Sequence, residues 1–206
     1  MSSPEPLVLI VSGPSGSGKS TLVQKILELP GTMLSVSCTT REPRKTEVNG
    51  KWYNFVTEDE FRDMVGRGDF LEYAQVFGKH WYGTPRKSLE RAEREKKDLV
   101  LEIDVQGALQ VKRKLPDAIS IFVLPPSRTD LERRIRARGQ NSPEEIRRRL
   151  ERARQEMLSY SSYDFGVIND NLEQAGREVQ AIALGSRCRV AREEERIREI
   201  LKSFGG

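Results

Sequence analysis

One stretch of eight residues near the N-terminus constrains the fold of this chain more than any other feature. It reads Gly13-Pro14-Ser15-Gly16-Ser17-Gly18-Lys19-Ser20 and fits the pattern G-x-x-x-x-G-K-[ST]. An apolar run of strand length (residues 7–11) precedes it, and apolar residues at helical spacing follow it up to Leu29. Strand, glycine-rich turn and helix is the order in which this pattern binds phosphate, because inward-facing backbone N–H groups meet the positive end of the helix dipole. The alternative, a glycine-rich turn with a chance lysine, is disfavoured by the two flanking elements.

The loop predicts a site for a nucleoside triphosphate. We expect Lys19 to neutralise the outer phosphates and the Ser20 hydroxyl to hold Mg²⁺. The nucleotide is expected to contact Gly13, Pro14, Ser15, Gly16, Ser17, Gly18, Lys19, Ser20 and Thr21.

Length and composition limit the class of protein. A chain of 206 residues can bury one good-sized core with small inserted lobes. No apolar run approaches the roughly 20 residues that a membrane span needs, and residues 1–6 lack the basic region and cleavage site of a secretory signal. We therefore expect a cytoplasmic protein with no membrane partner. Cys38 and Cys188 have no Cys or His neighbours at ligand spacing, so neither a zinc site nor a structural disulfide is expected.

The charge suits polyanionic ligands. The formal net charge is +4, and arginines concentrate at Arg41 and Arg44 and again between residues 128 and 154. Proteins that read nucleic acid on a sheet often add exposed aromatic residues, and we find no such pattern here. Small phosphorylated ligands therefore fit better than nucleic acid. The sequence does not choose between a monomer and a homo-oligomer.

Buried strands alternate with helices along most of the chain. The apolar runs of strand length lie at residues 7–11, 34–37, 99–103, 119–124 and 165–168. Helical patterns follow the first strand and recur at residues 105–115, 172–184 and 189–204. This alternation predicts an α/β fold of three layers, with a five-stranded parallel core sheet covered by helices on both faces.

The first interruption of this alternation covers residues 37–86. Strand-like pieces near residues 52–56 and 70–76 flank a helix that is opened by the capping box Thr57-Glu58-Asp59-Glu60. The stretch predicts an inserted, mixed α/β lobe. His80 is expected in one of its loops.

The second interruption covers residues 125–159 and is rich in arginine. Two helices are expected, the first ended by Gly139 and the second opened by the capping box at Ser142 with Pro143 as its first residue. Their apolar faces are thin, which favours a mobile lid. The core then comprises residues 1–36, 87–124 and 160–206.

The lobe begins with a candidate site for a phosphate group. Arg41 and Arg44 follow the end of a core strand, where ligands of open α/β sheets bind. Two guanidinium groups with a phenol hydroxyl, such as that of Tyr53, suit a monophosphate dianion. Two solvated surface arginines in a turn remain the alternative from composition alone.

Several motifs in a fixed order resemble guanylate kinase, a nucleoside monophosphate kinase of the P-loop class that phosphorylates GMP. The resemblance runs from about residue 7 to residue 185. Its motifs are Gly13–Thr21, Ser35-Val36-Ser37-Cys38-Thr39-Thr40-Arg41, Glu47-Val48-Asn49-Gly50, Phe70-Leu71-Glu72, Trp81-Tyr82-Gly83-Thr84, Ile103-Asp104-Val105-Gln106-Gly107, Pro125-Pro126-Ser127 and Ile168-Asn169-Asp170.

The resemblance implies that residues 37–86 form a GMP-binding lobe. The GMP phosphate would be held by Arg41, Arg44, Tyr53 and Tyr82, and the guanine would be read by Ser37, Glu72 and Thr84. A carboxylate can accept hydrogen bonds from N1 and the 2-amino group of guanine, whereas adenine would leave it unpaired. Thr84 stands where the family commonly has serine, and it keeps the hydroxyl.

The resemblance also implies roles around the transferred phosphoryl group. Asp104 would lie between the two substrates, where it organises Mg²⁺-bound water or the guanine edge; an ordinary strand-end carboxylate is the alternative. Glu102 stands where aspartate is usual. Asn169 would contact the adenine of ATP. Three lid arginines would close over the triphosphate: Arg134, Arg138 and Arg149.

The implied reaction is the Mg²⁺-dependent transfer of the γ-phosphoryl group of ATP to GMP or dGMP, which gives ADP and GDP. Two other functions stay open. Guanylate-kinase-like scaffold domains bind phosphorylated peptides without catalysis, but they usually have a damaged phosphate loop. A related P-loop kinase could act on another phosphate-bearing small molecule, although Glu72 with Ser37 argues for guanine.

Overall fold

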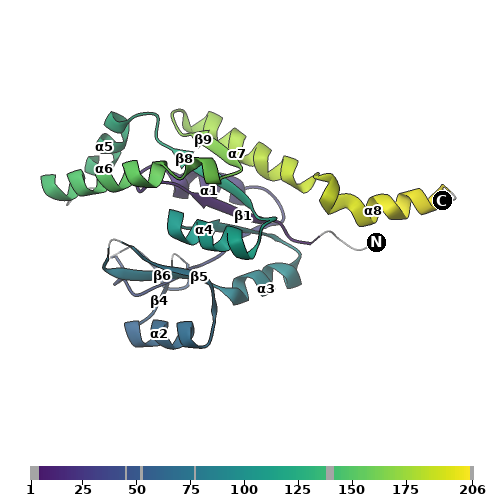
Figure 1. The fold of residues 1–206 in the computed structure, drawn as a ribbon, viewed down its shortest axis with the longest axis horizontal. Coiled ribbons are helices and arrows are strands. Elements are labelled where there is room, and N and C mark those ends of the chain that lie inside the picture. Colours follow the sequence, from purple (N-terminus) through teal and green to yellow (C-terminus); the bar gives the residue numbers. More distant parts are fainter. Residues whose placement is uncertain (1–4, 45, 52, 77, 138–141, 205–206) are drawn as a thin grey trace.

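The computed structural model describes residues 5–44, 46–51, 53–76, 78–137 and 142–204. Two sheets organise the chain (Figure 1). The larger sheet has the strand order β2-β7-β1-β8-β9, and every neighbouring pair in it is parallel, as predicted. Its strands are β1 (Val8–Ser12), β2 (Thr32–Leu34), β7 (Asp98–Glu102), β8 (Ile119–Leu124) and β9 (Phe165–Ile168).

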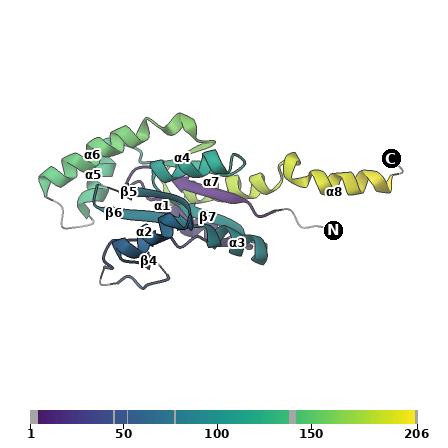
Figure 2. The same ribbon diagram turned by 60° about the horizontal axis from the view of Figure 1, so that its bottom comes forward.

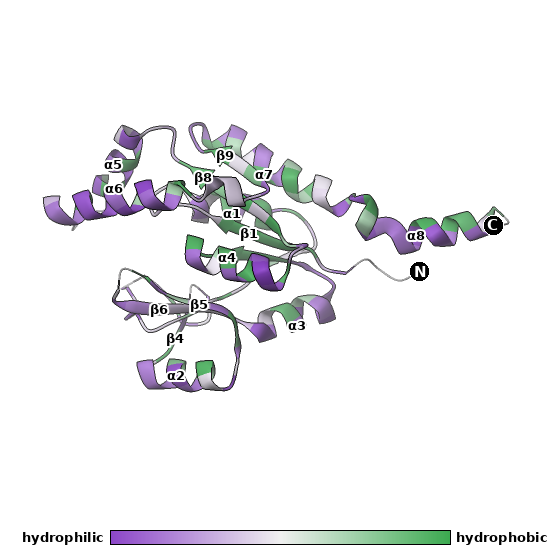
Figure 3. Ribbon diagram, viewed as in Figure 1, coloured by the Kyte–Doolittle hydropathy of each residue, from purple (hydrophilic) through white to green (hydrophobic). Residues whose placement is uncertain are grey.

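Helices cover both faces of this sheet. One face carries α1 (Lys19–Leu27) and α7 (Leu172–Arg187), whose Leu22, Val23 and Val179 are fully buried against β1, β8 and β9. The other face carries α3 (Arg86–Glu95) and α4 (Val105–Lys114). Figure 3 shows the hydrophobic strands between these helices. The predicted three-layer architecture is therefore confirmed.

The second expected strand, residues 34–37, is wrong in its bounds. β2 ends at Leu34, and the chain then passes to the smaller sheet. The reason lies in the hydrogen bonds of the next carbonyl groups: Val36 accepts from Asn54 Nδ2 at 2.9 Å, and Ser37 accepts from the Asn54 backbone N–H at 2.9 Å. These two carbonyl groups therefore accept hydrogen bonds from the lobe and do not pair with β7.

The smaller sheet lies between Cys38 and Pro85 and has the order β4-β3-β6-β5. It comprises β3 (Cys38–Thr39), β4 (Asn54–Phe55), β5 (Phe70–Val76) and β6 (His80–Pro85), and Trp52 lies outside the described residues. α2 (Glu58–Gly66) begins with the predicted capping box. Its Phe61 stacks on Phe70 with ring centroids 4.6 Å apart.

His80 was expected in a loop and instead begins β6. This strand pairs antiparallel with β5, matching Val76 with His80 and Glu72 with Thr84. The segment His-Trp-Tyr-Gly-Thr-Pro lacks the alternation of apolar and polar residues that marks a half-buried strand, which is why its pattern did not predict one.

The two expected helices are α5 (Arg128–Ala137) and α6 (Pro143–Met157), and the short 3₁₀ helix η1 (Tyr160–Ser162) follows them. The capping box at Ser142 is confirmed, while Gly139 lies outside the described residues. The apolar faces pack into a cluster of their own, formed by Leu131, Ile135, Ile146, Leu150 and Ala153.

The C-terminal helix α8 (Val190–Ser203) extends away from the rest of the chain in both views (Figures 1 and 2). None of its residues is buried, and Arg192 donates to the carbonyl group of Glu5. Across the described ranges, no helix is both long enough and apolar enough to cross a bilayer.

Candidate functional site

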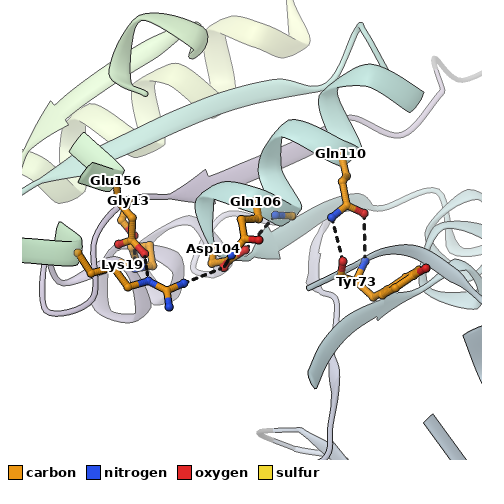
Figure 4. Close-up of polar contacts among 9 residues, drawn as sticks. Gly13, Lys19, Tyr73, Asp104, Gln106, Gln110 and Glu156 are labelled. Atoms are coloured by element: carbon orange, nitrogen blue, oxygen red, sulfur yellow. Dashed lines mark hydrogen bonds and ion pairs between the residues drawn. The ribbon is translucent and has the colours of Figure 1, made fainter. Parts of the chain in front are cut away.

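The glycine-rich loop connects β1 to α1 as a tight turn against the core. Gly13 has φ of 137°, and a Cβ there would lie 2.3 Å from the carbonyl oxygen of Val123, so only glycine fits. Lys19 bends back over the loop, where its Nζ donates to the carbonyl groups of Gly13 at 2.7 Å and Pro14 at 3.1 Å (Figure 4). The loop therefore presents its backbone and a lysine at the carboxyl end of the central strand, as the sequence predicts.

Two side chains beyond the loop support its backbone. The buried Asn169 donates from Nδ2 to the Ser17 carbonyl group at 2.9 Å. Arg134 of α5 donates to the same carbonyl group at 3.1 Å and to the Asn169 carbonyl group at 2.7 Å. Both residues were predicted to contact nucleotide, and in this structure they hold the loop that would bind it.

Ser20, which the sequence predicts as a Mg²⁺ ligand, lies beside the carboxylate of Glu102. The Ser20 hydroxyl, in the first turn of α1, donates at 2.6 Å to Oε1 of Glu102, the last residue of β7. One carboxylate and one hydroxyl suit Mg²⁺, which usually keeps several waters and binds substrate phosphates as its other ligands. In the described part of the chain, no cluster of three His, Cys, Asp or Glu side chains could hold a metal ion by itself.

The arginine site of the lobe is organised by Glu47, a residue that sequence reasoning left without a role. Arg41 Nη2 contacts both Glu47 oxygens at 2.9 Å, and the Arg44 backbone N–H donates to the same carboxylate at 2.8 Å. Although burial opposes the charges, these contacts raise the pKa of Arg41 and lower the pKa of Glu47. Arg41 is thus held as a permanent cation with its guanidinium oriented.

Two tyrosines complete the arginine site. The Arg41 guanidinium lies 5.6 Å from the centre of the Tyr53 ring, which meets the Tyr82 ring edge to face at 5.6 Å. Burial, and then the negative charge of Glu102, raises the pKa of Tyr53 to about 12. Its hydroxyl therefore stays protonated and can donate a hydrogen bond. Three of the four predicted phosphate-binding side chains are brought together here, and Arg44 is exposed beside them.

The predicted base-reading residues lie deeper, where the lobe meets the core. The Glu72 side chain is buried, with 3% of the residue exposed, and accepts a hydrogen bond from the Thr84 hydroxyl at 2.6 Å. Burial is the main reason that the pKa of Glu72 rises to about 7, and the nearby charge of Asp104 adds to it. Ser37 is also buried. Because burial makes the charged form of Glu72 costly, a ligand that donates hydrogen bonds to the carboxylate would stabilise it strongly.

Asp104 joins three parts of the molecule. It caps α4 by accepting from the Gly107 backbone N–H at 2.9 Å, and it lies two residues beyond Glu102, the last residue of β7. Arg152 of α6 lies 3.7 Å from its Oδ2 while also donating to Glu156 at 2.8 Å (Figure 4). No role was assigned to Arg152 from the sequence. Its contact with Asp104 joins elements far apart in the chain, so no local pattern indicates it.

The structure describes one of the other two predicted lid arginines. Arg149 lies half-buried on α6. Arg138 lies outside the described residues.

The comparisons with known proteins agree on one family. The family model described as guanylate kinase matches residues 5–184. A guanylate kinase of Clostridium perfringens is 44% identical over 194 residues, which cover 94% of this chain and 89% of that protein. The guanylate kinase of Escherichia coli K12 is 46% identical over 190 residues, or 91% of each chain.

A solved structure extends this likeness to the fold. The crystal structure of guanylate kinase from Anaplasma phagocytophilum superposes with a TM-score of 0.79 at 32% identity, over 98% of this chain and 95% of the other. With a family match over most of its length, a phosphate loop and a buried carboxylate at the junction of lobe and core, this chain belongs to the guanylate kinase family.

Proposed function

We propose that this protein transfers the γ-phosphoryl group of ATP to GMP, and also to dGMP, giving ADP and GDP. The observation that carries the proposal is the buried Glu72, hydrogen-bonded to Thr84 and placed between the arginine site of the lobe and the core. The family match supports the same reaction.

The acceptor base is selected by hydrogen-bond matching. Guanine presents two donors, N1–H and the 2-amino group, to the Glu72 carboxylate, while O6 can accept from the hydroxyl group of Ser37; the Thr84 hydroxyl already donates to Glu72. Adenine has an acceptor at N1 and no 2-amino group, so it would leave a buried carboxylate unpaired. Sites built on such matching discriminate by up to about 10⁴-fold.

The phosphate of the acceptor is anchored at the lobe. Arg41, Arg44, Tyr53 and Tyr82 offer two cations and two phenol donors to one dianion. The phosphate is itself the nucleophile and is already anionic near neutral pH, so the reaction needs no catalytic base. Catalysis then consists of positioning and charge neutralisation.

The donor is held by the core and the lid. The phosphate loop binds the triphosphate with Lys19, and Asn169 lies beside the loop near the expected adenine. The lid arginines Arg134, Arg138 and Arg149 neutralise the charge that develops on transfer. Ser20, and Asp104 through water, would hold Mg²⁺, which would neutralise the β- and γ-phosphates.

These roles divide the chain into a donor-binding core (residues 1–36, 87–124 and 160–206), an acceptor-binding lobe (37–86) and a lid (125–159). Closure of the lobe and lid would exclude water that otherwise hydrolyses ATP.

A panel of phosphate acceptors tests the proposal. ADP formation from ATP is measured in a coupled assay with GMP, dGMP, AMP, UMP and ribose 5-phosphate. We expect turnover with GMP and dGMP, and a specificity constant for AMP lower by about 10⁴-fold. A scaffold domain would form no ADP with any acceptor, and preference for another acceptor would identify a different kinase. Either result would overturn the proposal.

A further inference from the structure

Helix α4 of the core forms hydrogen bonds with β5, the edge strand of the lobe. β5 is the last strand of its sheet, so its outer edge has no neighbouring strand. Gln110 of α4 occupies that edge: its Nε2 donates to the Tyr73 carbonyl group at 2.8 Å, and its Oε1 accepts from the Tyr73 N–H at 3.4 Å (Figure 4). The carboxamide thereby does what the peptide groups of a fifth strand would do. Tyr73 directly follows Glu72, so this contact fixes the backbone that carries the carboxylate.

A glycine on the same face of α4 provides the space for that carboxylate. A Cβ at Gly107 would lie 2.4 Å from Glu72 Oε2 and 2.9 Å from its Cδ. Real Cβ atoms do not approach so closely, and the carboxyl group cannot move toward Thr84, whose hydroxyl is already at 2.6 Å. Glu72 is therefore confined between the first turn of α4 and β6.

The helix that makes these contacts is itself anchored to the core. Val111 and Ala108 are buried against the large sheet, in the cluster that also contains Leu71 of β5. At the far end, Lys112 Nζ donates to Asp164 at 2.7 Å and to the Ala118 carbonyl group at 2.7 Å. β5 thus has its position set by an element that does not belong to the lobe.

A third contact comes from the same face of α4. Lys114 Nζ donates to the Leu71 carbonyl group at 2.6 Å. Residues 107, 110 and 114 are three and four positions apart, so they share one face of the helix. They meet three consecutive residues of β5, which places Glu72 at the centre of the contact.

We propose that Gln110 and Gly107 are positioning residues for base selection: they fix the register of β5 and the location of the Glu72 carboxylate without touching substrate. This inference rests on the proposed function. It predicts that the specificity for guanine depends on a core helix as well as on the lobe. Hydrogen bonds to a charged group contribute about 1.5–3 kcal/mol, or roughly 10- to 100-fold, and depend on placement. Displacing the Glu72 carboxylate should therefore remove this roughly 10- to 100-fold preference for guanine.

The test compares GMP with IMP, which lacks the 2-amino group. Variants Gly107→Ala and Gln110→Met are assayed for kcat/KM with both acceptors at saturating ATP, and for the KM of ATP. Gly185→Ala on α7 is the matched control, because nothing lies within 4 Å of its added Cβ. Alanine favours helix over glycine, so a defect in Gly107→Ala cannot come from a weakened helix.

We expect the ratio of kcat/KM for GMP to that for IMP to fall roughly 10- to 100-fold in both variants, with the KM of ATP within about twofold of the wild-type value. The Gly185→Ala ratio should not change. An unchanged ratio in a folded Gly107→Ala or Gln110→Met protein overturns the inference, as does a parallel rise in the KM of ATP. If Gly107→Ala does not fold, Gln110→Met decides. Failure of the wild-type protein to use GMP would instead refute the proposed function.

Discussion

Glu72 should make the protein less stable as the pH rises, because its carboxyl group is buried. The folded-state pKa is about 7, against the ordinary value of 4.5 expected in the unfolded chain. Between these values the folded state binds the extra proton, so the free energy of unfolding falls with increasing pH. A difference of about 2.5 pKa units corresponds to about 3 kcal/mol, fully expressed above about pH 8. Glu72→Gln keeps the shape and cannot ionise, so it should lack this loss.

Urea denaturation at about pH 4.5 and about pH 8.5 measures the effect. The free energy of unfolding of Glu72→Gln, relative to wild type, should be roughly 3 kcal/mol higher at the alkaline pH than at the acidic pH. Other titrating groups are common to both proteins and cancel in this comparison. A stability difference that stays constant with pH would refute the reasoning that burial penalises the Glu72 charge.

Three further substitutions test the donor site, the acceptor site and the lid. Lys19→Ala should lower kcat for GMP phosphorylation by about 10²- to 10³-fold, since it removes a preorganised charge at the phosphate loop; activity near that of wild type would contradict this role. Arg41→Ala should raise the KM for GMP roughly 10- to 100-fold in steady-state assays and leave the KM of ATP unchanged, and unaltered GMP kinetics would remove the lobe arginines from the acceptor site. Leu131→Ala should lower the free energy of unfolding by about 2–5 kcal/mol in urea, because Leu131 is buried between α5, α6 and the phosphate loop near Gly16; a loss under about 1 kcal/mol would show that this packing is weak.

Much of the architecture could be predicted because its signals are local. Four of the five core strands follow apolar runs, β2 being the exception, and the helices α2 and α6 begin at capping boxes that can be read within four residues. The phosphate loop is a contiguous motif between a strand and a helix. β6 escaped prediction because its pairing with β5, and not its own composition, makes it a strand.

The candidate site shows the same division. From the sequence, the loop and the arginine pair could be predicted by residue type, and Glu72 could be singled out by the motif order that resembles guanylate kinase. Only the tertiary structure decided that Asn169 and Arg134 hydrogen-bond to the Ser17 carbonyl group of the loop, from 152 and 117 residues away. The same holds for the hydrogen bond between Gln110 and Tyr73, which are 37 residues apart. Hydrogen bonds between residues so far apart leave no periodic trace in the chain. They exist only once the two sheets and α4 have packed together.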